Sequence, residues 1–343
     1  MSNEMTAEQM MEYLYSLPEQ FARSLELDLT YVSRYKKDYR NIVVSGMGGS
    51  AIGGDILRVY AANKAKVPIT VVRDYSIPAF VDQHTLFLAA SYSGNTEETL
   101  SAYNQAREQG ASIICVTTGG KLKAMAEQDG YAVVEIPAGL VPRAATGYLF
   151  APLALLLEEL GIVDNVRPEL HETVEVLQGM REQLHPGVAA GSNQARIIAG
   201  KLKDSLPIIW GTAGVSEVAA LRWKAQINEN AKCPAYYGIL PELNHNEIVG
   251  FEVPRPLLAS LCCIILRDKY DYERVKRRIE ISKDIIKDQI KEIIEINSQG
   301  ESYLARFYSL VYIGDYASVY LALEYGINPT PVKVIDYLKA QLA

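Results

Sequence analysis

The chain contains 343 residues, of which 49% are hydrophobic and 22% are charged, a composition typical of folded globular proteins. This length is enough for two domains, and the formal net charge of −7 argues against a nucleic-acid partner, which would require a basic face. The longest apolar runs are too short to span a bilayer, and the N-terminus is unlike a signal peptide. The four cysteines show neither zinc-site spacing nor a disulfide pattern. We therefore expect a cytoplasmic protein with no membrane partner.

The first half of the chain alternates between strand-like and helix-like segments after an N-terminal helical segment, 1–38. The predicted strands are 41–46, 69–74, 85–91, 112–118 and 132–137, and the predicted helices between and after them are 50–62, 96–109, 121–128 and 145–160. Strands that are apolar on both faces and separated by helices are typical of a doubly wound parallel sheet. Ligands of such sheets bind beyond the carboxyl ends of the strands.

A second strand–turn–helix unit follows a helix at 165–185 and a linker at 185–194. When VVSGMGGSAIGGDIL (43–57) is set over IIWGTAGVSEVAALR (208–222), two pairs of glycines fall in register, Gly46 with Gly211 and Gly49 with Gly214. This favours two related α/β domains. Any strand–helix turn with two glycines would align about as well, so the duplication stays a hypothesis.

The rest of the second half is predicted as a helix at 216–230, a polar loop to 256, a strand at 257–266, a charged helix at 271–296 and a C-terminal helix at 334–342. The predicted division of the chain is an N-terminal helical segment 1–38, a first domain 39–160, a helical connection and linker 161–195, a second domain 196–330 and a C-terminal helix 331–343.

The stretch GMGGSAIGG (46–54) follows the first strand and opens a helix. Glycines there let a ligand approach the backbone, and the helix start offers unpaired N–H groups to an anion. A dinucleotide fingerprint would need glycine at position 51, where Ala51 stands, and the G-K-[ST] of a phosphate-binding P-loop is missing. We therefore predict an anion site built from Gly48, Gly49 and Ser50, with no nucleotide cofactor.

The stretch SYSGNT (91–96) follows the third strand and precedes a helix. Ser91 and Ser93 are two residues apart and can point the same way, and Thr96 lies at the helix start. The alternative is a helix cap, because Asn95 and Glu98 have the spacing of a capping box. Two successive turns of small residues on neighbouring strands favour a phosphate cradle over a simple cap.

These two motifs, S-x-S-G-x-T and G-x-G-G-S, resemble the sugar isomerase (SIS) domain. Together with VPRAATGYL, INENAK, ELNHNEIVGFE and ALEYGINPTPVKVIDYLK, they resemble the bifunctional phosphoglucose/phosphomannose isomerase family from about residue 40 to the C-terminus. The resemblance implies two flavodoxin-like SIS domains and the conversion of glucose 6-phosphate, and of mannose 6-phosphate, to fructose 6-phosphate through a cis-enediolate. It also implies a homodimer, with no cofactor and no metal.

Aldose–ketose isomerisation requires a carboxylate base, a cation near the enediolate oxygens and an acid–base group for the ring oxygen. Glu229, at the end of an amphipathic helix, is the predicted base, and Arg143, between the last strand and the last helix of the first domain, is the predicted cation. Each could instead be a surface residue. The resemblance implies that His245 opens the sugar ring, reaching the site from the partner subunit. Lys339 is the fourth candidate, with Lys333 as its alternative.

Three other functions fit these residues less well. A non-catalytic sugar-phosphate sensor would keep the phosphate cradle and lack the base, yet both Glu229 and His245 are present. The isomerase half of glucosamine 6-phosphate synthase would be joined to a glutaminase domain with a leading cysteine, for which this sequence gives no sign. A nicotinamide dehydrogenase is disfavoured by the failed dinucleotide fingerprint.

Overall fold

The computed structural model describes residues 6–342. The first five residues of the predicted segment 1–38 and the last residue of the predicted helix 331–343 lie outside the described part. The described residues divide into two compact units. The first unit comprises 17–175 with 302–304, and the second comprises 6–16, 176–301 and 305–342.

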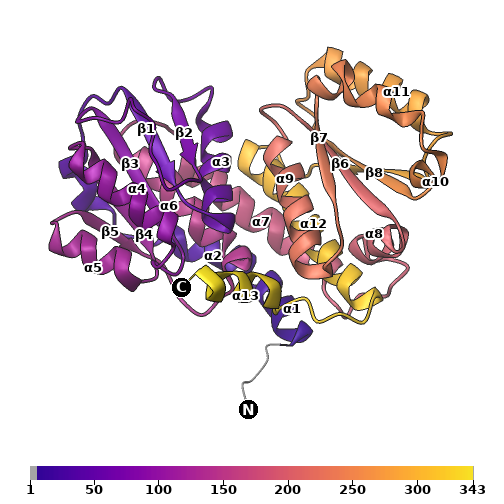
Figure 1. The fold of residues 1–343 in the computed structure, drawn as a ribbon, viewed down its shortest axis with the longest axis horizontal. Coiled ribbons are helices and arrows are strands. Elements are labelled where there is room, and N and C mark those ends of the chain that lie inside the picture. Colours follow the sequence, from indigo (N-terminus) through magenta and orange to yellow (C-terminus); the bar gives the residue numbers. More distant parts are fainter. Residues whose placement is uncertain (1–5, 343) are drawn as a thin grey trace. The chain divides into compact units, whose positions relative to one another are not determined.

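The first unit is built on a parallel sheet of five strands in the order β2-β1-β3-β4-β5 (Figure 1). The strands are β1 (Asn41–Ser45), β2 (Ile69–Val72), β3 (Thr85–Ser91), β4 (Ser112–Thr117) and β5 (Ala132–Glu135). Every residue of the central strand β3 is buried, as expected for a sheet covered on both faces. The predicted doubly wound parallel sheet is confirmed.

The helices of the first unit supply that cover. They are α2 (Leu17–Leu25), α3 (Gly48–Ala61), α4 (Glu97–Glu108), α5 (Gly120–Gln128) and α6 (Thr146–Glu159), with the 3-10 turns η1 (Thr30–Tyr35) and η2 (Pro142–Ala144). Helix α6 is buried along nearly its whole length, because its sequence is apolar on every side. Helix α7 (Val166–Leu184) begins in this unit and ends in the second.

The second unit contains a four-stranded parallel sheet in the order β7-β6-β8-β9. The strands are β6 (Leu206–Thr212), β7 (Tyr236–Leu240), β8 (Leu261–Arg267) and β9 (Glu292–Asn297). The first strand of each unit thus lies between the second and third, so the two sheets share one topology. In both units the glycine-containing turn of the sequence alignment joins this first strand to the next helix.

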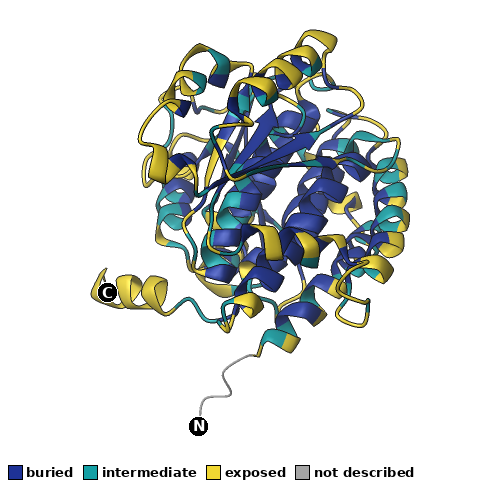
Figure 2. Cartoon of the chain, turned by 90° about the vertical axis from the view of Figure 1, so that its right-hand side faces the viewer, coloured by how far each residue is buried: buried dark blue, intermediate teal, exposed yellow. Residues whose placement is uncertain are grey.

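The helical elements of the second unit are α1 (Ala7–Tyr15), α8 (Gln194–Leu202), α9 (Glu217–Gln226), the π-helical turn η3 (Ile227–Ala231), the 3-10 turns η4 (Glu242–His245) and η5 (Glu247–Phe251), α10 (Arg255–Leu258), α11 (Glu273–Ile286), α12 (Tyr303–Glu324) and α13 (Lys333–Leu342). No residue of α13 is buried, and the helix is exposed along its length (Figure 2). Among residues 6–342, no helix is both long and apolar enough to cross a membrane.

Three predictions for the second half were wrong. The predicted helix 271–296 stops at Ile286, and its last residues form β9, where Ile294 and Ile296 are buried while Glu295 between them pairs with Lys283 at 2.5 Å. That alternation is the two-residue period of a strand, which the surrounding charges obscured. The predicted loop to 256 contains β7, and the predicted strand 257–266 begins as α10 and joins the sheet only from Leu261.

Each sheet falls inside one of the predicted domains, β1–β5 within 39–160 and β6–β9 within 196–330. The boundaries of the predicted segments stay predictions.

Candidate functional site

The order of the first sheet places a topological switch point between β1 and β3. The chain leaves β1 toward β2 on one side and leaves β3 toward β4 on the other, so a crevice forms beyond their carboxyl ends. The register sets Ser45 of β1 opposite Ala89 of β3. Gly48, Gly49 and Ser50 begin α3, directly after the turn that follows β1, and the predicted hydroxyls run from the end of β3 to the start of α4. Both halves of the predicted cradle therefore lie at this edge.

The glycine turn allows a close approach of α3 to its neighbour. A Cβ at Gly49 would lie 2.8 Å from the carbonyl oxygen of Pro142, so only glycine fits there without a shift. Gly48 has φ +51°, and the residue at the N-cap of α3, Met47, makes no side-chain capping hydrogen bond. The first N–H groups of α3 therefore face the switch point with no side-chain cap.

The predicted hydroxyls are held by backbone N–H groups. Ser50 Oγ accepts from the Tyr92 N–H at 3.3 Å, Ser91 Oγ accepts from Gly94 at 3.1 Å, and Ser93 Oγ accepts from Asn95 at 3.3 Å. A hydroxyl whose oxygen accepts in this way keeps its proton to donate. The three serines thus retain O–H groups that can donate to an anion, although one proton of the Ser91–Thr96 pair is used in their mutual hydrogen bond.

The contacts of Thr96 test the helix-cap alternative. It stands at the N-cap of α4, but its side chain makes no capping hydrogen bond and instead lies 3.0 Å from Ser91 Oγ. Asn95 is also engaged elsewhere, because its Oδ1 accepts from the Lys121 N–H at 3.1 Å. The capping-box interpretation is wrong, and the N-terminus of α4 opens toward the same edge as that of α3.

Arg143 lies on η2, the turn between β5 and α6, and is only 5% exposed. The close contact of Gly49 with Pro142 packs this turn against the start of α3. A buried guanidinium is therefore fixed beside the glycine turn, which adds positive charge to the partial positive charge of the helix start. The alternative that Arg143 is a surface residue is wrong.

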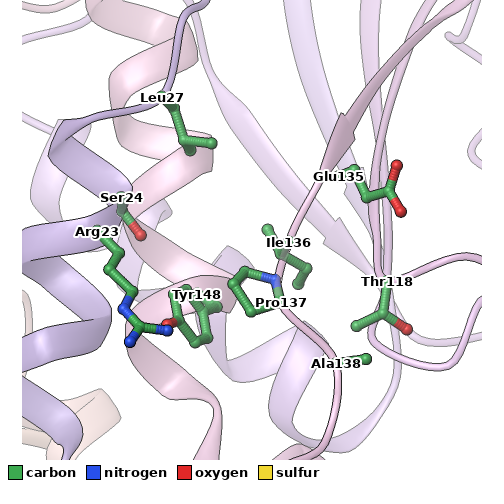
Figure 3. Close-up of a pocket in the computed structure, with 9 residues that line it drawn as sticks. All are labelled: Arg23, Ser24, Leu27, Thr118, Glu135, Ile136, Pro137, Ala138 and Tyr148. Atoms are coloured by element: carbon green, nitrogen blue, oxygen red, sulfur yellow. The ribbon is translucent and has the colours of Figure 1, made fainter.

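Two cavities of the first unit lie away from the predicted phosphate-binding residues. One cavity of about 330 Å³ lies between α2 and the loop after β5, with Arg23 and Tyr148 on one side and Thr118 across from them (Figure 3). A second, of about 540 Å³, adjoins the segments that enter β1 and β2, at Tyr39 and Val67. Neither cavity is lined by a predicted phosphate-binding residue. We therefore define the candidate site by the switch point and its hydrogen bonds.

Glu229 belongs to the second unit and lies on η3, a single π-helical turn that continues α9. Its side chain is half-buried. Such π-turns are rare and occur frequently at functional sites. The regular helix predicted over 216–230 therefore ends at Gln226, and the predicted base lies in the widened turn after it.

The other predicted residues of the second unit are more exposed. His245 is the last residue of η4 and lies on the surface, and Lys339 lies on the last turn of the exposed helix α13. Lys333, the alternative lysine, begins the same helix. The structure thus brings together Ser50, the S-Y-S-G-N-T hydroxyls and Arg143 in the first unit. Glu229, His245 and Lys339 lie on three separate elements of the second.

Two features of the site were missed in the sequence. Tyr92 connects the serine turn to its surroundings, since its hydroxyl donates to the Pro137 carbonyl at 3.0 Å and accepts from the Leu140 N–H at 3.0 Å. A buried ion pair, Arg222 with Asp315, lies on the helix that carries the Glu229 turn and on α12. A single aspartate inside the apolar run YSLVYIGDYASVYLAL was the available signal for it.

Within residues 6–342, no three His, Cys, Asp or Glu side chains are grouped so that they could hold a metal ion. The donors at the first switch point are hydroxyls, backbone N–H groups and a guanidinium, all suited to an anion.

Comparisons with known proteins agree with this organisation. Residues 37–139 match the SIS domain model, and residues 191–342 match the model of the bacterial phospho-glucose isomerase C-terminal SIS domain. A solved structure of a hypothetical protein from Thermus thermophilus superposes with a TM-score of 0.74 at 16% identity, covering 99% of this chain and 91% of that one. That likeness shows the fold.

Two curated relatives are both named bifunctional phosphoglucose/phosphomannose isomerase. The one from Caldicellulosiruptor bescii is 50% identical over 335 residues, covering 97% of this chain and 99% of its own. The one from Aquifex aeolicus is 36% identical over 333 residues, with the same coverage of both chains. The chain therefore belongs to the bifunctional phosphoglucose/phosphomannose isomerase family.

Proposed function

We propose that this chain is a phosphosugar isomerase that interconverts glucose 6-phosphate, and mannose 6-phosphate, with fructose 6-phosphate without a cofactor. The observation that carries the proposal is the pair of helix starts at the first switch point, α3 and α4, which lack side-chain caps and are surrounded by oriented hydroxyls. Family membership supports the same activity.

The phosphate dianion binds at the first switch point. Ser50, Ser91, Ser93 and Thr96 donate O–H groups to its oxygens, and the N–H groups at the starts of α3 and α4, including the Gly48–Gly49 turn, complete the cradle. Binding the phosphate end fixes the position of the carbon chain, so the reacting carbons lie at a set distance from the anchor.

Glu229 is the base that moves the proton. It removes the C2 proton of the open-chain aldose, the C–H electron pair forms the C1–C2 double bond, and the carbonyl electrons move to O1. Return of the proton to C1, with loss of the O2 proton and its transfer to O1, gives the ketose. C2 is planar in this cis-enediolate, so both C2 epimers pass through the same intermediate. Arg143 stabilises the negative charge on the enediolate oxygens.

His245 opens the sugar ring. It takes the proton from O1 and delivers a proton to O5 as the C1–O5 bond breaks, and Lys339 assists by placing positive charge near the ring oxygen. This assignment rests on the family motif and on the residue types.

A second copy of the chain completes the site. Strand β7 is an edge strand with Tyr236 58% exposed, and Val249 and Val253, which follow His245 in sequence, are 67% and 74% exposed. Exposed apolar groups beside an open sheet edge are typical of a protein–protein interface. We place His245, in this same region of the second unit, across the dimer interface. All four cysteines are free thiols, which suits the cytoplasm.

The test is production of fructose 6-phosphate from each epimer with a chelator present, for the wild type and for Glu229→Gln. The variant keeps the size of the side chain and loses the base, so we expect kcat to fall by about 10³-fold or more while KM changes little. A Glu229→Gln variant as fast as the wild type, or turnover abolished by the chelator, would refute the mechanism. Sugar-phosphate binding without turnover by the wild type would favour the sensor.

A further inference from the structure

The π-turn η3 places Glu229 on a different face of the helix from Gln226, Asn230 and Ala231. In a regular helix, residues three and four positions past Gln226 would share its face. A π-turn needs one more residue per turn, so Asn230 and Ala231 take up that face and Glu229 is turned away from it. Burial agrees with this, since Gln226, Asn230 and Ala231 are at most 2% exposed, whereas Glu229 is half-buried.

The buried face of this segment is hydrogen-bonded to α12. Arg222 forms a bidentate ion pair with Asp315, with Nε–Oδ1 and Nη2–Oδ2 distances of 3.1 and 2.7 Å. Gln226 Nε2 donates to Asp315 Oδ1 at 2.9 Å, one helical turn farther along.

The next turn, which contains Glu229, is also hydrogen-bonded to α12. Asn230 Nδ2 donates to Ser318 Oγ at 2.9 Å, and the Ser318 hydroxyl donates to the main-chain carbonyl of Asp315 at 2.7 Å. The two α12 residues are three positions apart, so they lie on one face of that helix.

The far side of the turn is also held. Lys232 has φ +57°, which ends the helix, and its Nζ donates to the main-chain carbonyl of Glu229 and to that of Pro329, the latter at 3.1 Å. Glu229 is thus fixed through its own backbone on one side and through its neighbour Asn230 on the other.

We propose that Asn230 and Ser318 are positioning residues for Glu229, with the Arg222–Asp315 pair as their support, an inference that rests on the proposed role of Glu229 as the base. Buried ion pairs and polar networks are weak contributors to net stability, and apolar side chains of similar size often serve as well. Helix α12 carries a second buried ion pair, Arg306 with Asp268, so burial of polar groups on this helix does not by itself indicate a role. The Asn230–Ser318 hydrogen bond differs from that pair because it joins α12 to the residue next to Glu229. Holding the base in position is therefore the role we assign to it.

The experiment measures kcat and KM for fructose 6-phosphate in Asn230→Ala, Ser318→Ala and the double variant. Ser318→Ala removes a single oxygen and is the variant that retains the fold most easily. We expect each single variant to lower kcat by about tenfold to a hundredfold with KM within about twofold, because the phosphate cradle is untouched while the base is misplaced. The double variant should be little worse than either single one, since both remove the same hydrogen bond.

Asn193→Ala is the matched control. Asn193 is a fully buried asparagine of the same unit whose Nδ2 also donates to α12, to the Tyr320 hydroxyl at 3.3 Å, and it lies outside the candidate site. Its loss should lower the melting temperature and leave kcat unchanged. Equal losses of kcat in Asn193→Ala and the two test variants, or wild-type kcat in both test variants, would overturn the positioning role.

Glu229→Gln separates this proposal from the function itself. An inactive Glu229→Gln variant together with normal Asn230→Ala and Ser318→Ala variants would refute only the positioning role. A fully active Glu229→Gln variant would refute the proposed base, whatever the other variants do.

Discussion

The two sheets share one topology, yet their switch points are chemically opposite. The helix starts at both switch points lack side-chain caps. At the first, between β1 and β3, the side chains around the helix starts are hydroxyls. At the second, between β6 and β8, the chain's own carboxylates accept hydrogen bonds from main-chain N–H groups. The Gly214 N–H donates to Glu217 Oε2 at 3.0 Å, and the Asp268 N–H donates to Asp271 Oδ2 at 2.9 Å.

Two acids of the second switch point, Asp268 and Asp271, are also buried. Asp268 and Asp271 are 6% and 2% exposed, and Arg306 Nε donates to Asp268 at 2.9 Å. A phosphate dianion there would meet carboxylates where the first switch point offers hydroxyls. The fold places main-chain N–H groups that can bind an anion at each switch point. Whether a ligand or one of the chain's own carboxylates binds them depends on the side chains nearby. We therefore expect one phosphate site per chain.

Placing a carboxylate in the first switch point should have the largest effect. Thr96→Asp puts a negative charge at the N-cap of α4, where repulsion of about 4 kcal/mol between unit charges 4 Å apart corresponds to about a 10³-fold loss in kcat/KM. The same aspartate caps the helix, which should stabilise the fold by about 1 kcal/mol. Kinetics and thermal unfolding of one preparation of Thr96→Asp test the expected loss in kcat/KM and the expected gain in stability. Thr96→Ser is the control that keeps the hydroxyl. An active Thr96→Asp variant would mean that phosphate does not bind here.

The next effect concerns the backbone of the serine turn. Gly94 has φ +67°, and a Cβ there would lie 1.8 Å from the Gly119 carbonyl oxygen, so Gly94→Ala should lower stability by about 3 kcal/mol or more. Gly130 is the matched control, with φ +78° and nothing within 4 Å of an added Cβ, so Gly130→Ala should lower stability by only about 1 kcal/mol. Differential scanning calorimetry compares the two, and equal melting temperatures would contradict the close packing of the turn.

The smallest effect belongs to the second switch point. Burial raises the pKa of the Asp271 carboxyl above its ordinary value of 3.8, and the nearby Asp268 adds to the shift. A raised folded-state pKa contributes stability that is fully present below the unfolded pKa and is lost as the pH rises through the folded pKa. Asp271→Asn removes that dependence. Its melting temperature should therefore improve relative to the wild type as the pH rises from acid to neutral, and a constant difference at every pH would contradict this.

Sequence patterns predicted the first unit well because its signals are local. Apolar runs followed by turn residues predicted all five strands, and the S-Y-S-G-N-T stretch predicted the hydroxyls of the switch point. The failures were in the second unit, where β7 is an exposed edge strand with tyrosines in place of an apolar run, and β9 alternates isoleucine with glutamate at the end of a charged helix. Such strands are defined by pairing with β6 and β8, which sequence periodicity does not report.

The residue types of the candidate site could be predicted from the sequence, but the hydrogen bonds between them could not. Nothing in the sequence showed that Thr96 would bond to Ser91 in place of capping α4, because the two conformations differ by one side-chain rotation. The π-turn at Glu229 was equally hidden, and the buried hydrogen bond beside it joins Asn230 to Ser318, 88 positions away. Long-range polar contacts of this kind have no local signature.

The most direct test of the difference between the switch points is a calorimetric titration with sorbitol 6-phosphate, which lacks the carbonyl group and cannot be isomerised. We predict one molecule bound per chain, binding lost in Thr96→Asp, and binding retained in Glu217→Gln, which alters only the second switch point. Two molecules per chain, or unchanged binding by Thr96→Asp, would contradict the assignment of the phosphate site.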